Sequence, residues 1–523
     1  MTGDSGPHAA GSNRPDRPSG TGEMNQTGIA LMSETTTVRP QRANAITEWD
    51  FEADVVIAGY GVAGACAAIE AKRAGADVLV LERTGGWGGA ASMSGGFIYL
   101  GGGTALQKAL GFEDTPENME KFMTAALGPG VDAAKIHDYC QGSVEHFDWL
   151  VAQGVPFKEE FWGEPGWEPA HDEGLMYSGG ENSAPFKDIA TPAPRGHLPQ
   201  MENKRIGEKG GGYMLMKPLI DTAESLGVRA EYDIRIQRLI VDEDDRVVGV
   251  VAKRYGDLVH VRARRGVVLA TGSFAYNQEM IEAYVPRLLN RPAASIEEHD
   301  GIGIRVAQAL GAQVAHMDAA EVAFFVDPQM VARGIMVNAR GQRYITEDTY
   351  CGRVGQATLN QQDNKAYLIM DEQALEAALA TESSVTFFRQ PPKWAAETVA
   401  ELESDMGLPE GTLQTTVEVY NKHAAQGSDP LLDKKTEWVK PIGTPLAGFD
   451  LREHTGGFTL GGLKTDLDSR VLHVSGDPIS GLYAAGRCTS GVCTGGYASG
   501  TSLGDGSFYG RRAGKAAAAA TQD

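Results

Sequence analysis

A stretch near the N-terminus, DVVIAGYGVAGACAAIEAKRAGADVLVLER at residues 54–83, limits the possible folds of this chain more than any other feature. Its apolar run at 55–58 predicts a buried strand, the glycines after it predict a tight turn, and the following residues predict an amphipathic helix over 62–74. Gly75 ends that helix, and a second apolar run predicts a strand over 77–82. These elements in this order form the βαβ unit that binds dinucleotides.

Each glycine of the turn has its own role in such a unit. Gly59 permits the tight turn, Gly61 lets the backbone approach a pyrophosphate at the helix N-terminus, and Gly64 lets helix and strand pack closely. Glu82 follows Gly64 by eighteen residues, where a carboxylate can accept hydrogen bonds from a ribose. The pattern therefore predicts a bound dinucleotide without saying which one.

The loop after the second strand, GGWGGAASMSGG at 85–96, favours a flavin over a nicotinamide. A nicotinamide-binding domain would continue into another crossover helix at this point. Here, glycines together with Ser92 and Ser94 offer backbone amides and short donors that can lie against a ribityl chain and a flat ring. The alternative is a flexible Gly-rich loop without a ligand.

Composition and charge exclude several classes of protein. The chain has 523 residues with 69 acidic and 47 basic side chains, a net charge of −22 and no basic cluster, so nucleic acid is not an expected partner. Five scattered cysteines predict neither a disulfide framework nor a metal site, and they fit a reducing, cytoplasmic setting. No apolar run is long enough to predict a transmembrane helix.

Residues 1–48 are rich in Gly, Ser, Thr, Pro and Asn and show no apolar periodicity, which predicts a disordered tail. The tail lacks the charged and apolar regions of a signal peptide. Met24 and Met32 leave the true start of the protein open.

Several later stretches occur in a recognisable order. Residues 210–277 predict a helix, a strand ending near Leu239, an acidic turn, a hairpin and a buried strand at 267–270 that runs into Thr271 and Gly272. They are followed by DGIGIRVAQALGA at 300–312, GIMVNARGQRYITED at 334–348 and GLYAAGRCTSGV at 481–492. With these motifs the chain resembles, over nearly all of residues 50–517, the FAD-dependent fumarate reductase and 3-ketosteroid dehydrogenase superfamily.

The resemblance implies an α/β fold in which a Rossmann-like FAD-binding domain is discontinuous, at 49–290 and 440–523. An α+β substrate-capping domain at 291–439 is inserted between the two parts. The stretch 301–311 imitates a second nucleotide fingerprint, but no apolar strand precedes it, so we predict a helix against the flavin domain and no NAD(P)H site. Some relatives attach FAD covalently through a His in the loop that corresponds to 85–96. The corresponding stretch here, AASMSGG, contains no His, so we expect non-covalent FAD.

The fingerprint and the resemblance together predict the residues that contact the FAD. In many relatives, a Glu against the ribityl region of the flavin occupies the position of Arg487, so this chain departs from the family pattern there. Amides around Ser502 and Leu503, at the start of a predicted C-terminal helix, could face the flavin pyrimidine. The full set is Gly59, Gly61, Val62, Ala63, Gly64, Glu82, Arg83, Gly88, Gly89, Ala90, Ser92, Ser94, Gly95, Gly96, Ile236, Ala270, Thr271, Gly272, Asp300, Arg487, Ser502 and Leu503.

The stretch GGYASGTSLGDG at 495–506 indicates which reaction the flavin performs. Fumarate reductase relatives carry His-Gly and Asn-Arg there, because a dicarboxylate needs fixed positive charge. This chain has no cation between Arg487 and Arg511, so the local chemistry is neutral hydrogen-bond donation, which suits a ketone oxygen. The stretch looks most like that of the Δ4-(5α) type of 3-ketosteroid dehydrogenase.

That resemblance implies the site residues and the reaction. Tyr497 and Ser499 would donate hydrogen bonds to the ketone as it gains enolate character. Tyr350, carried over from the capping domain, would remove the C4 proton while flavin N5 takes the C5 hydride, which converts a 3-oxo-5α-steroid to the Δ4-enone. A phenol needs a lowered pKa or a relay for this role. Arg343 and Arg353 are near Tyr350 in sequence. The electrons would pass to a quinone or an electron-transfer protein.

Several alternatives stay open at this point. The reaction could be Δ1-dehydrogenation or enoate reduction, and the chain could be a flavin-binding interaction module. Glu347 and Asp348 are alternative bases, although a paired acidic turn is more often structural. His454 could contact the flavin edge or cap a strand. Residues 151–209 resemble an insertion near the substrate entrance, and we predict no role for them.

Overall fold

The computed structural model describes residues 37–203, 208–362, 365–451 and 453–521 of the chain. Most of the predicted disordered tail lies outside these residues. Its last part differs from the prediction, because β1 (Gln41–Arg42) pairs in parallel with β9 (Ile234–Val241). A two-residue strand carries no periodicity that a sequence pattern could reveal, so the ordered part begins before residue 49.

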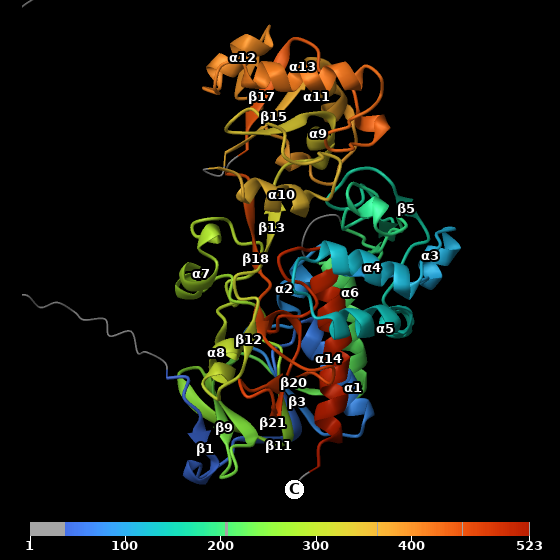
Figure 1. The fold of residues 1–523 in the computed structure, drawn as a ribbon. Coiled ribbons are helices and arrows are strands. Elements are labelled where there is room, and N and C mark those ends of the chain that lie inside the picture. Colours follow the sequence, from blue (N-terminus) through green and yellow to red (C-terminus); the bar gives the residue numbers. More distant parts are fainter. Residues whose placement is uncertain (1–36, 204–207, 363–364, 452, 522–523) are drawn as a thin grey trace, which may run out of the picture. The chain divides into compact units, whose positions relative to one another are not determined.

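The predicted strand, helix and strand near the N-terminus form β2, α1 and β3, and the two strands are neighbours in a large mixed sheet. Figure 1 labels α1 and β3. The strand order is β1-β9-β10-β11-β2-β3-β8, and β21 joins β11 and carries β20. The long strand β11 pairs with β10 over its first half and with β21 over its last residues, and pairs in parallel with β2. The bounds not yet given are β2 (Phe51–Ala58), α1 (Val62–Arg73), β3 (Val78–Leu81), β8 (Arg229–Glu231), β10 (Val247–Arg254), β11 (Asp257–Leu269), β20 (Arg470–Leu472) and β21 (Pro478–Ala484).

Both faces of the large sheet are buried, which explains why β2 is apolar along most of its length. Val55 and Ile57 point to a core formed with helices α1, α6 (Gly211–Ser225) and α14 (Thr501–Ala519). Val56 and Ala58 point to a second core formed with the antiparallel strands β9, β10 and β11. This alternation follows from the two-residue period of a strand.

Helices α1 and α14 lie side by side along the sheet, with α6 beside α1 (Figure 1). Small residues allow this close approach, because a Cβ atom at Gly510 or Gly514 would clash with backbone atoms of Ala63 or Ala67. The packing fixes the start of α14, and therefore the Gly-rich loop before it, against the start of α1.

Residues 97–201 form a helical layer and a small sheet next to α14 (Figure 1). This region contains most of the segment for which the sequence predicted no role. Its strands follow the order β4-β7-β6-β5. The elements are β4 (Ile98–Tyr99), α3 (Ala105–Ala109), α4 (Pro116–Ala126), α5 (Ala133–Ala152), β5 (Phe161–Trp162), β6 (Leu175–Met176) and β7 (Gly196–His197).

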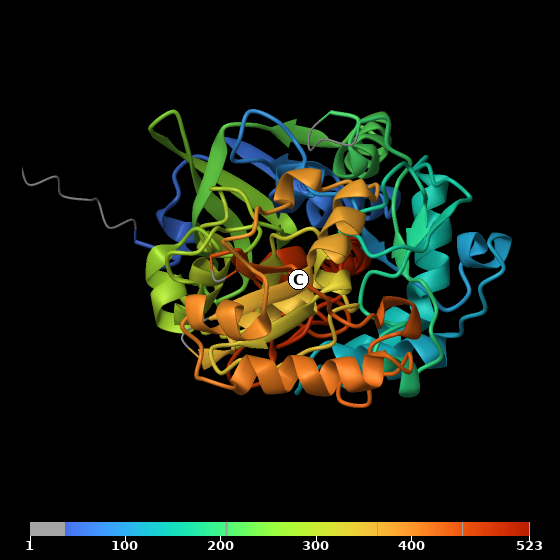
Figure 2. The same cartoon turned by 90° about the horizontal axis from the view of Figure 1, so that it is seen from above.

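A second sheet, in the order β14-β15-β17-β16, forms the centre of a separate layer that we call the cap. One face of this sheet packs on α12 and α13, and the other on α9, α10 and α11. In the view from above, the cap lies in front, in yellow and orange (Figure 2). Its elements are α9 (Pro328–Arg333), β14 (Ile335–Asn338), α10 (Cys351–Leu359), β15 (Ala366–Asp371), α11 (Glu372–Ala380), β16 (Trp394–Ala396), α12 (Val399–Asp405), α13 (Thr412–Ala424) and β17 (Leu446–Asp450).

An antiparallel ladder of β13 (Ala320–Phe324) and β18 (Thr455–Thr459) connects the cap to the large-sheet part (Figure 1). Helix α10 packs on this ladder. A shorter pair, β12 (Val314–Ala315) with β19 (Gly462–Leu463), continues toward the large sheet. The chain therefore enters and leaves the cap along neighbouring strands.

The predicted boundaries of the capping domain need correction at both ends. The stretch 301–311 forms the predicted helix, α8 (Ile302–Gln308), which packs on β9 and so belongs with the large sheet. It follows α7 (Gln278–Tyr284). At the other end, β17 completes the cap sheet beyond residue 439. Helix packing decides the first boundary and strand pairing the second, and a sequence pattern does not show which strands pair.

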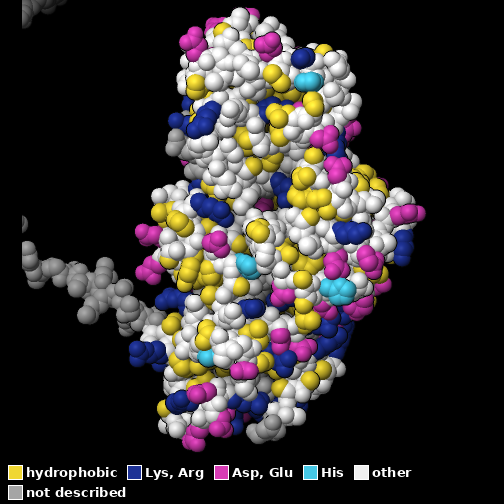
Figure 3. All heavy atoms as spheres, viewed as in Figure 1, with side chains coloured by type: hydrophobic (Ala, Val, Ile, Leu, Met, Phe, Trp, Pro, Cys, Tyr) yellow, Lys and Arg dark blue, Asp and Glu magenta, His cyan; other side chains and the backbone are white. Residues whose placement is uncertain are grey.

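One face of the molecule shows how charged side chains are distributed. On the face shown in Figure 3, Lys and Arg side chains are dispersed among acidic and apolar ones. Among the described residues, the longer helices are all too polar to cross a membrane.

Candidate active site

The turn between β2 and α1 has the close approaches that the fingerprint predicts. Gly59 adopts a φ of 105°, and a Cβ there would clash with the carbonyl of Ala270 at the end of β11. A Cβ at Gly64 would clash with the carbonyl of Gly59, so the helix packs directly on the turn. Gly61, the N-cap of α1, has no such crowding beside it, which leaves its backbone approachable from outside. This geometry fits the pyrophosphate of a dinucleotide.

Glu82 lies buried directly after β3 and is held by donors from two loops. Its carboxylate accepts hydrogen bonds from the Tyr60 N–H at 2.8 Å, the Thr84 N–H at 2.9 Å and the Thr84 hydroxyl at 3.0 Å. These contacts fix the carboxylate next to the Gly-rich turn. Its contact with a ribose stays a prediction.

The Gly-rich loop at 85–96 contains a short helix, α2 (Gly89–Met93). The predicted loop is therefore more regular than expected. A Cβ at Gly96 would clash with the backbone of Gly211 at the start of α6, so glycines close this loop onto α6. Ser92 and Ser94 donate their hydroxyl protons to the carbonyls of Gly89 and Ala91, and their oxygens keep lone pairs for other donors.

Two hydroxyls in the predicted cofactor set indicate that a polar ligand belongs here. Within the described residues, the Thr271 Oγ1 and Ser502 Oγ atoms are buried and lack a partner in hydrogen-bonding geometry. An unsatisfied buried hydroxyl costs about 1–3 kcal/mol. They lie on the loop after β11 and at the start of α14, where the FAD was predicted. A ligand rich in oxygen and nitrogen, such as FAD, would satisfy them.

Asp300 and Arg487, also predicted to contact the cofactor, take part in ion pairs. Asp300 accepts hydrogen bonds from Arg83 at 2.8 Å and Arg235 at 2.5 Å. Arg487 pairs at 3.1 Å with Asp505 of α14, and both side chains are largely buried. The Asp505 carboxylate compensates the positive charge of Arg487 at this buried position.

The predicted reaction residues come from two segments, the start of α10 and the loop before α14. Tyr350 is the N-cap residue of α10, and its hydroxyl donates to Oε1 of Glu321 on β13 at 3.0 Å. Tyr497 lies in the loop before α14, packs edge-to-face on Phe458 at 5.5 Å, and accepts a hydrogen bond from the Ser502 N–H at 3.2 Å. Tyr350, Glu321 and Tyr497 interact electrostatically, so the fold brings them to one place.

Ser499 is positioned by the region that the sequence left without a role. Its N–H donates to the Ser178 carbonyl at 2.8 Å, and the Ser178 hydroxyl donates to the Ser499 carbonyl at 2.9 Å. The segment after β6 therefore holds the backbone of the Gly-rich loop through two hydrogen bonds.

Burial sets the protonation of these groups. It raises the pKa of Tyr350 well above the usual value for tyrosine, and Glu321 adds to that shift. Burial also raises the pKa of Tyr497. Burial raises the pKa of Glu321 to about 7, against the opposing effects of the Tyr350 hydrogen bond and the charge of Arg353. Both phenols are therefore neutral near pH 7, while Glu321 can exist in either form.

A family model described as FAD binding domain matches residues 54–503, which is most of the chain. The chain belongs to this family. A crystal structure of 3-ketosteroid-Δ4-(5α)-dehydrogenase from Rhodococcus jostii RHA1, in complex with 4-androstene-3,17-dione, is 72% identical with a TM-score of 0.91. That match covers 92% of this chain and 100% of the other.

More distant relatives include both expected kinds of enzyme. The 3-oxo-5-alpha-steroid 4-dehydrogenase of Comamonas testosteroni is 28% identical over 506 residues, covering 84% of this chain and 93% of its own. The probable fumarate reductase Ifc3 of Shewanella frigidimarina is 27% identical over 476 residues, covering 89% and 74%. The expected α/β fold, the FAD cofactor and an oxidoreductase class are therefore confirmed for this family member.

Sequence reasoning missed Glu321. The signal available was a single carboxyl inside an otherwise apolar strand, AEVAF at 320–324. Such a residue is rarely buried unless it has a partner. Its partner is 29 positions away, and only the packing of α10 on β13 reveals it.

The other candidate bases belong to a structural network. Glu347 is fully buried and pairs with Arg343 at 2.7 Å and Lys434 at 3.4 Å. Asp348 accepts a hydrogen bond from the Lys435 N–H. His454 precedes β18, where its carbonyl accepts from the Phe325 N–H, and burial lowers the pKa of its imidazole. None of these residues is hydrogen-bonded to Tyr350 within the described part of the chain.

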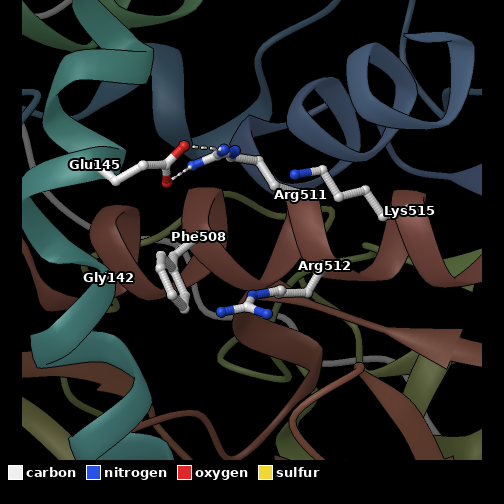
Figure 4. Close-up of a pocket in the computed structure, with 6 residues that line it drawn as sticks. All are labelled: Gly142, Glu145, Phe508, Arg511, Arg512 and Lys515. Atoms are coloured by element: carbon white, nitrogen blue, oxygen red, sulfur yellow. Dashed lines mark hydrogen bonds and ion pairs between the residues drawn. The ribbon is translucent and has the colours of Figure 1, made fainter. Parts of the chain in front are cut away.

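A cavity of about 240 Å³ between α5 and α14 is lined by none of the predicted site residues (Figure 4). It contains several cations, but the carboxylates beside them already pair with them. Arg511 pairs with Glu145 at 2.8 Å, and Lys515 pairs with Glu70 at 3.0 Å. We therefore assign Arg511 to the contact of α14 with α5, and Lys515 to the contact of α14 with α1. The lining residues are Gly142, Glu145, Phe508, Arg511, Arg512 and Lys515.

Proposed function

We propose that this protein dehydrogenates 3-ketosteroids and introduces the C4–C5 double bond into 3-oxo-5α-steroids. The proposal is supported by the 72% identity to the Rhodococcus jostii dehydrogenase, over the whole length of that chain. Several more distant relatives act on other substrates, so the local chemistry of the site has to decide among them.

The observation that carries the proposal is the neutral hydrogen-bonding loop at 495–506. Tyr497 accepts a hydrogen bond from the Ser502 N–H, so its own proton can be donated to a ketone oxygen. Ser499 lies two residues before the start of α14 and would add a second donor. A donor fixed before the reaction stabilises the oxygen as it gains enolate character, typically by about 3–4 kcal/mol for one donor.

Tyr350, unlike Tyr497, is placed to accept a proton from the substrate rather than to donate a hydrogen bond to it. Its hydroxyl donates to Glu321, so the oxygen lone pairs can accept a proton from the substrate. Because burial raises the pKa of Tyr350, the phenolate is not the resting form, and Tyr350 can act as a base only if its own proton moves on. We propose Tyr350 as the residue that receives the C4 proton.

The proposed FAD would lie between the βαβ turn, Glu82, the loop at 88–96 and the start of α14. When bound, the FAD would supply the acceptor for the hydride from C5 of the steroid. The neutral protein donors would bind the ketone, stabilise its oxygen as it gains enolate character, and orient the ring. We propose a quinone or an electron-transfer protein as the external electron acceptor.

We also propose a cytoplasmic location. All five cysteines are buried free thiols, which is the state that a reducing compartment maintains. The described residues contain no group of His, Cys, Asp and Glu side chains that could hold a metal, and the proposed reaction requires none.

Anaerobic mixing of the purified holoenzyme with 5α-androstane-3,17-dione tests the function. We expect the flavin absorbance to bleach and 4-androstene-3,17-dione to form. Reduction by 4-androstene-3,17-dione instead would indicate Δ1-dehydrogenation, and oxidation of reduced enzyme by fumarate would indicate enoate reduction. A holoenzyme that no 3-ketosteroid reduces would contradict the proposal.

A further inference from the structure

Glu321 is an unusual residue for its place in the fold. It lies in the middle of the β13–β18 ladder, opposite Phe458, and is 5% exposed. The rest of β13 is apolar or small. A carboxyl in such a strand costs free energy unless a specific partner compensates it.

The partner is Tyr350, and the local structure makes room for the pair. A Cβ atom at Gly352, the second residue of α10, would clash with both the Glu321 carboxylate and the Tyr350 ring. Glycine is a less favourable helix residue than alanine. This glycine lies where the Tyr350 phenol and the Glu321 carboxyl meet, and a larger residue would push them apart.

The other groups that face Glu321 are few. Arg353 lies on α10 and acts on it through its charge, while its guanidinium donates to the carbonyls of Gly179 and Ala126. Among the described residues, the thiols of Cys351 and Cys493 and the hydroxyl of Tyr497 also interact electrostatically with Glu321, and strand β18 presents the neutral Phe458. Tyr350 is therefore the neighbour that can exchange a proton with Glu321 directly.

We propose that Glu321 is the proton acceptor behind Tyr350, so that the C4 proton enters Tyr350 as the phenol proton moves to the Glu321 carboxylate. The inference rests on the proposed dehydrogenation. Glu321 would act only through Tyr350, as a positioning and relay residue that does not touch the steroid.

The proton transfer balances without an added reactant. The C4–H bond breaks and a new O–H bond forms on Tyr350, while the former Tyr350 O–H bond breaks and an O–H bond forms on Glu321. Tyr350 stays neutral, and the negative charge leaves the carboxylate as the electron pair of the C4–H bond stays with the steroid. The two-electron oxidation is the one already assigned to the FAD.

The relay predicts a pH dependence with a defined sign. Glu321 must be ionised to accept a proton, and burial raises its pKa to about 7. The rate of flavin reduction by 5α-androstane-3,17-dione should therefore fall tenfold for each pH unit below about 7. Exchange of the steroid C4 hydrogens with D2O, followed by mass spectrometry, should show the same dependence without needing hydride transfer.

Glu321→Gln keeps the size of the side chain but removes the proton acceptor. We expect it to lower flavin reduction and C4 exchange by about 100-fold or more and to abolish the pH dependence, with FAD content unchanged. Glu321→Asp should restore part of the rate and the pH dependence. The matched control is Glu181→Gln, at a buried carboxyl that accepts a hydrogen bond from Tyr99, and it should keep the pH dependence.

The possible results separate the relay from the function. We call the predicted fall in rate below about pH 7 the acid limb. A wild-type enzyme that is reduced by the steroid but shows no acid limb between pH 5.5 and 8.5 overturns the relay, even if Glu321→Gln does not fold. So does a Glu321→Gln enzyme with wild-type rate and pH dependence. A wild-type holoenzyme that no 3-ketosteroid reduces overturns the proposed function, and the relay with it.

Discussion

The pairs Tyr350–Glu321 and Tyr99–Glu181 are built alike but have different surroundings. In each, a tyrosine hydroxyl donates to Oε1 of a buried glutamate at 3.0 Å, and burial raises the pKa of the carboxyl. Glu181 also accepts from the Gly179 N–H at 2.9 Å and lies near the positive charge of Arg195. The second pair is thus surrounded by fixed donors and charge.

The Arg195 side chain shows how rigid that second environment is. It donates two hydrogen bonds to Asp114, at 2.8 and 2.7 Å, and both side chains are fully buried. Tyr99 stacks on Phe122 and lies at the start of the small sheet. The Tyr350 hydroxyl, by contrast, lies near Tyr497 and the neutral loop before α14. The same pair of groups can therefore support the fold in one place and move a proton in another, depending on what faces the tyrosine oxygen.

The largest expected effect separates the two tyrosines. Tyr350→Phe removes the proposed proton acceptor, so flavin reduction by 5α-androstane-3,17-dione should slow by about 10³- to 10⁴-fold, or about 4–5.5 kcal/mol in the barrier. Anaerobic stopped-flow absorbance measures the rate. The FAD should stay bound, because Tyr350 is not among the predicted cofactor residues.

Tyr99→Phe is the matched control for that experiment. It removes a hydroxyl with the same kind of partner, at the same distance, and should change the rate by less than about tenfold. Equal losses in both variants would mean that the pairs are equivalent and that Tyr350 has no special part in the reaction.

Arg195→Met should lower stability more than activity. It leaves Asp114 charged and buried without its partner, which we expect to cost about 3–5 kcal/mol in the free energy of unfolding. Urea unfolding of the holoenzyme measures the loss. Arg229→Ala, at the exposed pair with Asp77, should cost less than about 1 kcal/mol. A change in the pH dependence of turnover in Arg195→Met would show that the Glu181 side also takes part in proton transfer.

Tyr497→Phe tests the donor side of the neutral loop. Loss of one preorganised donor to the ketone should lower kcat by about 10²- to 10³-fold. Because Tyr497 donates and does not accept a proton, the acid limb near pH 7 should remain in this variant. A variant that loses the limb would instead place Tyr497 in the relay.

Local signals made the βαβ turn and its flanking elements predictable. The glycines around Gly59 and the apolar run of β2 specify a turn and a strand within a few residues, and α14 follows its own Gly-rich start. The Tyr350–Glu321 pair was not predictable, because it depends on α10 packing on β13. The end of the cap was misplaced for a similar reason, since β17 pairs with β15 across a long connection. Pairing of distant segments leaves no periodicity in either segment.

The smallest expected effect concerns stability at Glu321. Its pKa, about 7 in the folded protein, is raised from 4.5, so the folded state holds this proton more tightly than the unfolded state. The contribution to stability is therefore complete below about pH 4.5 and is lost as the pH rises to about 7. Glu321→Gln cannot ionise, so at pH 8 it should be more stable than wild type by up to about 3 kcal/mol, with no difference at pH 4.

Urea unfolding at the two pH values measures this difference. Glu403→Gln is the comparison variant, because its effect on stability at pH 8 should have the opposite sign. Burial alone would raise the pKa of Glu403, but hydrogen bonds from the Gln414 side chain and from backbone amides at the start of α13 lower it overall. That variant should therefore be less stable than wild type at pH 8. A stabilised Glu321→Gln that has also lost its acid limb would mean that the enzyme keeps a destabilising carboxyl because the proton transfer needs it. An equally stable variant at both pH values would mean that the buried carboxyl is already compensated, and that Tyr350–Glu321 is as structural as Tyr99–Glu181.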